Sequence, residues 1–354
     1  MNVKRAVRLA ISAGLLAILL MGMDWDAVQM RLSHLRPSMT LLFVIALGLQ
    51  FTLSSWKWQW ALRIHELYFP YAFLTRIFLI GFFLNNFLPT SIGGDAYRVY
   101  RTLPPDPPRS RAVSAVVLER VVGLCSLLLL GIAGAIALYP AVPLARWYLV
   151  VMLLAGALLV LLVVSFAKFW PQLSRNAVQT PSRWLRPVIE NLRSIARARD
   201  EWIPLLSLSL LFQAQAFLII YGLFAALGEH VSLTQAALIA AAAGLATIIP
   251  LSINGLGVVE ASTAGAAVAV GATYEAGLLV ALLIRILVIP FTLAAALLYA
   301  FEPASAHDMS QVAASVVDTS AAEASDPSAP HLHANADTGP PSSYSDYLKK
   351  TRPD

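Results

Sequence analysis

The chain has 354 residues, of which 58% are apolar and only 13% are charged, with a formal net charge of +5. Ordinary globular domains carry about 25% charged residues, so this composition excludes a soluble globular protein. Acidic residues gather in residues 303–354, which leaves a net charge of about +9 on residues 1–302, and no nucleic-acid-binding motif accompanies that excess. We therefore interpret the basic residues as signals of orientation in a membrane.

Long apolar runs follow one another through residues 1–302, and a transmembrane helix needs about 20 mostly apolar residues. The sequence predicts an all-α polytopic membrane protein with about seven spanning helices and two re-entrant segments broken by Pro and Gly. The predicted apolar segments are 6–23, 39–62, 71–88, 112–139, 147–169, 202–227, 233–250, 257–272 and 277–301.

The first apolar run follows a basic start at residues 4–8, which is also typical of a cleaved signal peptide. No small-residue cleavage site follows, so we interpret the run as the first membrane helix. The positive-inside rule then places the N-terminus in the cytoplasm and a loop at 24–38 outside. Lys57, Arg63 and His65 mark the cytoplasmic end of the second helix.

Two similar stretches interrupt the apolar sequence, and both follow the pattern P-x-S-I-x-G, at residues 89–94 and 250–255. In lipid, irregular backbone persists only where protein buries it or where it lines a wet cavity. Paired breaks in two halves of a chain point to a transport site. The positive-inside rule favours a cytoplasmic position for the arginines at 98–111. They reach it only if the first segment turns back at its break. The second segment is then entered from outside, which predicts an inverted repeat; chance similarity in apolar sequence is the alternative.

The remaining polar segments are predicted to be cytoplasmic. Residues 168–200 hold seven basic and two acidic residues, and residues 183–199 within them form a predicted amphipathic helix. We expect that helix at the membrane interface, with packing on the protein's own loops as the alternative. Residues 303–354 have no apolar period and are predicted to form a disordered tail, so the transmembrane domain is 1–302.

Charged side chains deep in predicted membrane helices are the first candidate site residues. A charge near the bilayer centre costs about 2.5–3.5 kcal/mol on insertion scales, so Glu119, Arg120 and Arg285 need partners there. Neighbouring helical residues point about 100° apart, so Glu119 and Arg120 are not expected to pair with each other. Two interpretations stay open: the charges join helices through buried hydrogen bonds, or Arg120 and Arg285 grip an anionic headgroup with their bidentate forks.

The two breaks supply further candidates. Glycines at the helix starts offer backbone N–H groups that suit phosphate. Asp95 and Glu260 are candidates for helix capping, cation binding or proton transfer, with capping expected for Asp95. Amides at membrane depth need partners and are expected to face a cavity. The predicted substrate-binding residues are Asn85, Asn86, Pro89, Gly93, Gly94, Asp95, Arg98, Glu119, Arg120, Pro250, Asn254, Gly255, Gly257, Glu260 and Arg285.

Motifs for catalysis are not found in the sequence. It has no G-x-x-x-x-G-K-[ST], G-x-S-x-G or H-E-x-x-H pattern, so we expect no cofactor, no metal and no catalytic residue. The single cysteine, Cys125, excludes an intramolecular disulfide.

Three motifs resemble one known family. The run FLNNFLPTSIGGDAYR at 83–98 is similar to the signature of the transmembrane region of lysylphosphatidylglycerol synthases, also called the flippase-like domain family. Residues 118–123 and 250–260 match its other two blocks, and the resemblance covers about 5–301. It implies a membrane-embedded lipid translocator. In full-length synthases of this family a soluble domain aminoacylates phosphatidylglycerol; no counterpart of that domain is recognisable here, so lysyl transfer is not implied.

We therefore expect a multi-pass inner-membrane protein that moves an anionic phospholipid or a lipid-linked glycan between leaflets. Its expected partners are membrane lipids and a lipid-synthesis or glycosyltransferase protein, but not nucleic acid. Two alternatives stay open. One is a membrane-embedded lipid or polyprenyl-phosphate glycosyltransferase, which needs an acidic or metal-binding motif. The other is a scaffold of a lipid-synthesis complex.

Overall fold

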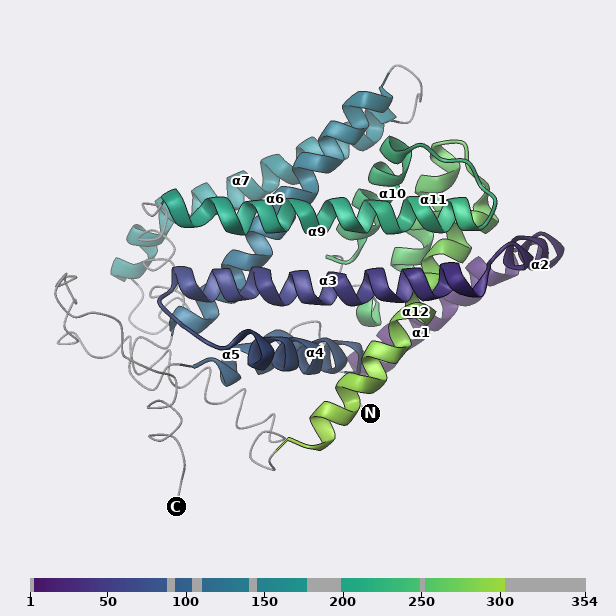
Figure 1. Cartoon of the computed structure of the whole chain (residues 1–354). Coiled ribbons are helices and arrows are strands. Elements are labelled where there is room, and N and C mark those ends of the chain that lie inside the picture. The colour runs from purple at the N-terminus through teal and green to yellow at the C-terminus, as the bar shows by residue number, and fades with distance from the viewer. Residues whose placement is uncertain are drawn as a thin grey trace.

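The computed structural model describes residues 3–87, 93–103, 110–139, 145–176, 199–248 and 252–302. All regular structure in these ranges is helical, as the composition predicts (Figure 1). The elements are α1 (Val3–Met21), α2 (Trp25–Ser33), α3 (Pro37–Ile64), α4 (Tyr71–Phe87), α5 (Gly93–Arg101), α6 (Ser110–Leu138), α7 (Ala145–Asn176), α9 (Arg199–Ala226), α10 (Leu233–Ala246), the 3₁₀ turn η1 (Ile253–Gly255), α11 (Val258–Ala269) and α12 (Tyr274–Ala300). The predicted tail and all but the last residue of the predicted interfacial helix lie outside the described ranges.

Every predicted apolar segment coincides with a helix, but only some of these helices are long enough to cross a membrane. Among the described residues, α3, α6, α9 and α12 pass a test of length and apolar composition. A fifth span is reached if α1 and α2, bent by 85° at their junction, count as one. The apolar stretches of α4, α7, α10 and α11 are shorter. The predicted number of about seven spans is therefore not confirmed by length and composition.

The external connection predicted at 24–38 contains a helix that the sequence analysis did not predict, because α2 occupies most of it. Asp24 caps this helix: its Oδ1 accepts hydrogen bonds from the backbone N–H groups of Asp26 at 3.0 Å and Ala27 at 3.3 Å. Such a cap satisfies donors that a helix start otherwise leaves free, so a short helix forms immediately after the bend that follows α1.

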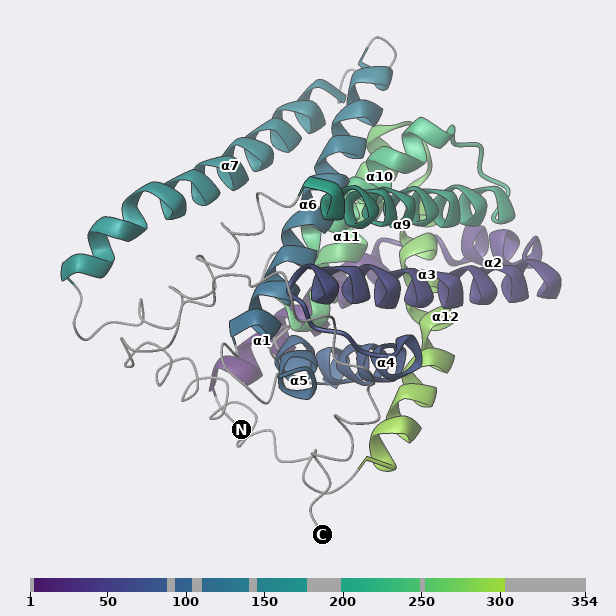
Figure 2. The same cartoon turned by 60° about the vertical axis from the view of Figure 1, so that its left-hand side comes forward.

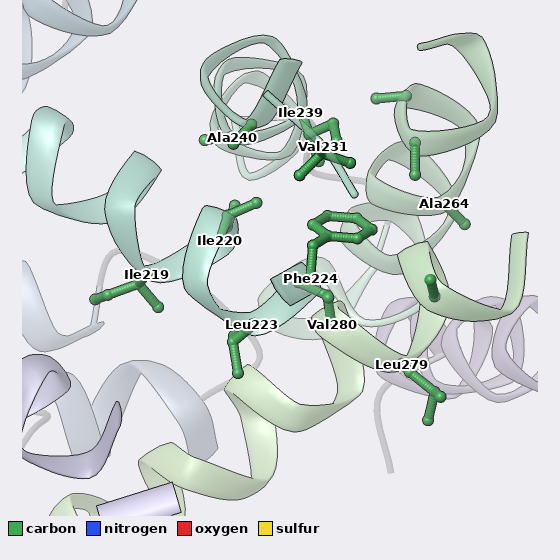
Figure 3. Packing of buried hydrophobic residues seen from close by; sticks show 14 of the residues in the cluster. Ile219, Ile220, Leu223, Phe224, Val231, Ile239, Ala240, Ala264, Leu279 and Val280 are labelled. Atoms are coloured by element: carbon green, nitrogen blue, oxygen red, sulfur yellow. The ribbon is translucent and has the colours of Figure 1, made fainter. Parts of the chain in front are cut away.

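The largest apolar cluster lies between α9, α10, α11 and α12. Figure 3 shows Phe224 of α9 among side chains of its neighbours, including Ile239 of α10 and Val280 of α12. Alanine dominates the packed faces of α10 and α11, and small side chains let helices approach closely where lipid gives no hydrophobic drive between them. This cluster holds the second broken segment against the long helices.

Of the remaining long helices, α3 and α9 pack against each other, whereas α7 diverges from the others. Figure 1 shows α3 and α9 lying side by side, in agreement with their mutual packing. In Figure 2, α7 departs from the other helices, and many of its described apolar side chains, among them Trp147, Leu154 and Leu161, are exposed. Exposed apolar side chains along a long helix suit contact with lipid.

Helices α4 and α5 fold back on each other as a hairpin. A Cβ added to Gly94 would lie 1.9 Å from the carbonyl oxygen of Gly81, so the two backbones touch. The Arg101 guanidinium at the end of α5 lies 5.8 Å from the ring of Phe73 near the start of α4. The end of α5 is therefore beside the beginning of α4, and residues 88–92 between the helices lie outside the described ranges.

Helices α10 and α11 form a second hairpin, which opens toward the other end of α12. Gln235 at the start of α10 donates a hydrogen bond of 2.9 Å to the carbonyl of Val270, just past α11. The chain then enters α12 through its cap Thr273. The first hairpin opens at the far end of α12, where Glu302 contacts Arg101 of α5. The two hairpins thus open toward opposite ends of the same helix.

Candidate functional site

The hairpins meet through two asparagine side chains. Asn254 Nδ2 donates a hydrogen bond of 2.5 Å to Asn86 Oδ1, which joins η1 to the end of α4. Asn254 has a φ of +49°, in the left-handed region that asparagine tolerates better than most residues. Its carbonyl also accepts a bond of 3.4 Å from Arg285 Nη2. One residue therefore links the second hairpin both to the first hairpin and to α12.

Asp95 and Arg120 form the accessible part of a larger charged cluster. Arg120 Nη2 lies 2.9 Å from each Asp95 carboxylate oxygen, and its Nε lies 3.2 Å from Oδ2. Asp95 Oδ1 also accepts a bond of 3.1 Å from Arg98 Nη1. The Arg120 side chain is 59% exposed, whereas that of Asp95 is 20% exposed. Part of the arginine fork is thus free to meet another anion.

The buried part of the cluster lies between α3, α5 and α6. Arg98 Nη2 donates to Glu119 Oε2, and the Arg98 guanidinium lies 4.3 Å from the ring centroid of Trp58. Lys57 Nζ lies 3.7 Å from Glu119 Oε1 and 4.7 Å from the ring centroid of Phe212. Cations over aromatic faces gain electrostatic stabilisation where water is excluded. We call the five ionic residues Lys57, Asp95, Arg98, Glu119 and Arg120 the α5–α6 network.

Glu260 and Arg285 form a second ion pair, which we call the α11–α12 pair. Glu260 is fully buried; its Oε1 accepts from Arg285 Nε and its Oε2 accepts from the Gly257 backbone N–H at 2.6 Å. The arginine follows the acid by 25 residues in this pair, as Arg120 follows Asp95. Each acid lies in the first turn of the helix after a break, and each arginine lies on the next helix.

Several sequence expectations hold at these residues. Glu119 and Arg120 do not pair with each other but find separate partners, as predicted from their angular separation. The asparagines predicted to need partners also have them: Asn85 Oδ1 accepts from the Gly94 N–H at 2.7 Å, and Asn86 binds Asn254. Glu260 caps α11 through Gly257, one of the roles considered for it.

Asp95 lies in the first turn of α5, and its carboxylate is bound by Arg98 and Arg120. The capping role expected for it stays a prediction, because the residues before α5 lie outside the described ranges. One expectation is corrected. The glycine N–H groups expected to be free for phosphate are partly occupied, because Asn85 binds Gly94 and Glu260 binds Gly257. Because Asn85 and Glu260 already accept hydrogen bonds from these two N–H groups, neither N–H group needs a ligand as its partner.

The remaining candidates are placed as follows. Gly93 is buried at the start of α5, and Gly255 is buried in η1 with a φ of +69°. Gly257 has a φ of +85°, which glycine adopts without strain. Pro89 and Pro250 lie outside the described residues.

Lys57 and Glu302 are site residues that the sequence reasoning missed. Lys57 was interpreted as part of a basic helix end, but it is 5% exposed and faces Glu119. Its position between two tryptophans of an apolar helix was the available signal. Glu302 follows α12, and its buried carboxylate contacts both Arg76 of α4 and Arg101 of α5. Nothing in the local sequence distinguishes it from a tail residue.

The arrangement can bind anions by partner exchange. Arginine binds carboxylate and phosphate with the same bidentate fork, so a phosphate can replace Asp95 at Arg120 without a change in the fork's geometry. Among the described residues, no three His, Cys, Asp or Glu side chains lie close enough together to hold a metal ion.

Comparison with known proteins agrees with the motifs. Residues 5–296 match the family described as the lysylphosphatidylglycerol synthase TM region. Comparison with curated proteins finds no match. The matched residues include both hairpins, the α5–α6 network and the α11–α12 pair, and the match confirms the resemblance inferred from three short motifs. This chain belongs to the lysylphosphatidylglycerol synthase transmembrane region family.

Proposed function

We propose that the protein is a lipid translocator of the inner membrane, with both termini in the cytoplasm, which moves an anionic phospholipid or a lipid-linked glycan between leaflets. The headgroup crosses beside the hairpin contact while the acyl chains stay in lipid. Membrane lipids are then its main partners.

The observation that carries this proposal is the exposed arginine of α6 that binds Asp95 at the closed end of the first hairpin. The Arg120 guanidinium is partly exposed. The two Asp95 carboxylate oxygens bind it with the geometry that two phosphate oxygens would adopt. A charge at such a position in an apolar helix is expensive and is usually retained for function. A headgroup phosphate would displace Asp95 and leave the aspartate with its second partner, Arg98.

The two hairpins support a mechanism of alternating access. We infer that they are inverted repeats, because they open toward opposite ends of α12 and each is joined to the next helix by an acid–arginine pair with the same spacing. Rocking of one repeat against the other would break the Asn86–Asn254 contact and expose the headgroup site first to one leaflet and then to the other.

Reconstitution tests the function directly. Purified protein in liposomes should move fluorescent phosphatidylglycerol or another anionic lipid between leaflets, and Arg120→Ala and Arg285→Ala should each lower the rate at least tenfold. The matched control is Arg31→Ala, which removes an arginine from a 2.6 Å ion pair with Glu229 far from the network and should retain the rate. Absence of movement for every anionic lipid, with Arg120→Ala equal to wild type, would refute the proposal.

Topology gives an independent test. Single cysteines at Arg111 and Ala272, both partly exposed and introduced with Cys125→Ser, should react with an impermeant label from opposite sides of the membrane, inside and outside respectively. Labelling of both positions from one side would remove the inverted repeat while leaving lipid movement open.

A further inference from the structure

The α5–α6 network carries more positive than negative groups. Its cations are Lys57, Arg98 and Arg120, and its anions are Asp95 and Glu119. The α11–α12 pair, in contrast, has one of each. With all groups ionised the network therefore holds one unbalanced positive charge. The excess lies in the buried part of the network, because the side chains of Lys57, Arg98 and Glu119 are each at most 7% exposed, whereas Arg120 is 59% exposed and pairs with Asp95. An unbalanced charge among buried groups is costly, so the network needs either an added anion or the loss of one proton.

Lys57 is the member of the network that can lose a proton. Arginine keeps its charge in proteins, whereas a lysine amine can be neutral when buried. Protonation of Asp95 or Glu119 would increase the imbalance. Both carboxylates also accept bonds directly from Arg98.

The surroundings of Lys57 fit a group that can hold or release a proton. Helix α6 supplies Glu119, whose Oε1 lies 3.7 Å from Nζ, and the charge of Arg120; α5 supplies the charge of Arg98, and α9 supplies the Phe212 ring at 4.7 Å. Glu119 and the ring favour the ammonium form, while the two arginines and near-complete burial oppose it. A small change in network charge can therefore decide the state of the amine.

We propose that Lys57 is a proton-binding site coupled to anion binding: it takes up one proton when an anionic headgroup binds Arg120 and releases the proton when the headgroup leaves. The proton passes from water to Nζ and back, and no other bond is made or broken. The network is then neutral both when empty and when occupied. The inference rests on the proposed function and adds protons as its driving ion.

Calorimetry counts these protons without any transport. Dioctanoyl-phosphatidylglycerol is titrated into detergent-solubilised protein in two buffers with different ionisation enthalpies, with dioctanoyl-phosphatidylcholine as the neutral-headgroup control. Wild type should take up about one proton per phosphatidylglycerol bound, and its affinity should fall by up to about tenfold per pH unit as the pH rises. Lys57→Arg and Lys57→Met should bind with no proton uptake. Lys168→Met, which changes a lysine of α7, should behave as wild type.

The outcomes separate this inference from the proposed function. Binding by wild type without proton uptake, or unchanged uptake in Lys57→Arg, would overturn the role of Lys57 and leave lipid binding intact. Failure of folded wild type to bind phosphatidylglycerol at any pH would remove the anionic-headgroup site and the coupling with it. Thermal unfolding of each variant shows whether it is folded before the titration.

Discussion

Asn254 donates a hydrogen bond of 2.5 Å to Asn86 across 168 residues of chain. This bond connects two hairpins that open toward opposite ends of α12. Asn86 lies three residues before the first P-x-S-I-x-G stretch and Asn254 lies within the second, so the bond joins the two parts of the described fold that carry related sequence. Any movement of one hairpin against the other must stretch or break this bond.

A double-mutant cycle measures that connection. Asn86→Ala and Asn254→Ala should each destabilise the protein, and the double variant should lose less than the sum, because both single changes remove the same hydrogen bond. The expected coupling is about 1 kcal/mol. Unfolding by SDS in mixed micelles gives the free energies. Additive losses would show that the two side chains do not interact in the membrane protein.

The α11–α12 pair predicts a large loss of stability on removal of its acid. Glu260→Gln removes a fully buried carboxylate and leaves Arg285, whose side chain is 29% exposed, without its partner; breaking one side of a buried ion pair in this way costs up to about 3 kcal/mol. The control Glu275→Gln removes a carboxylate at the first turn of α12 and should change stability by less than about 0.5 kcal/mol. Similar losses in both variants, measured by SDS unfolding, would contradict the special role of Glu260.

The close contact inside the first hairpin predicts intolerance of one methyl group. In Gly94→Ala the new Cβ would meet the Gly81 carbonyl oxygen, a backbone atom that cannot swing away. Helices α4 and α5 must then move apart, which breaks the Asn85–Gly94 hydrogen bond. We expect the free energy of unfolding to fall by about 1–3 kcal/mol. Gly265→Ala in α11 meets nothing within 4 Å and should be neutral or stabilising by up to about 1 kcal/mol. Equal thermal stability of the two variants would show that the hairpin is looser than described.

The sequence predicts most helices of this fold, because most are continuous apolar runs bounded by Pro, Gly or charged residues; among the described helices, α2 and α5 are polar. It fails at α2, where a polar helix depends on the cap from Asp24 rather than on apolar content. The number of spans stays a prediction, since the short α10 and α11 can cross or return depending on their surroundings.

The candidate site was predictable in its members but not in its pairings. The motifs locate Asp95, Arg120, Glu260 and Arg285, yet nothing in local sequence says that acid and arginine join across 25 residues. That pairing depends on how α5 packs against α6 and α11 against α12. Lys57 was missed for the same reason: a basic residue near a helix end is typical of an orientation signal, and only packing shows that it faces Glu119.

His65 is a buried titratable group outside the membrane-spanning segments. It follows α3, is 4% exposed, and its Nδ1 lies 2.8 Å from the Ala61 carbonyl oxygen. Its Nε2 has no hydrogen-bond partner among the described residues. Burial, together with the charge of Arg111, lowers the pKa of His65 below its ordinary value. The folded protein therefore holds this histidine neutral at a pH where the unfolded chain protonates it.

The sign of the pH dependence follows from this difference. Below about pH 6.5 the unfolded chain binds a proton at His65 that the folded protein does not, so stability falls as the pH is lowered, by up to about tenfold in the unfolding equilibrium constant per pH unit. His65→Asn has no titrating group there, and its stability relative to wild type should rise between about pH 6.5 and pH 5. His230→Asn, at an exposed histidine, should follow wild type. Parallel pH profiles for wild type and His65→Asn would mean that His65 binds a proton as readily in the folded protein as in the unfolded chain. Its burial and its Nε2, which has no hydrogen-bond partner in the described part of the chain, oppose that outcome.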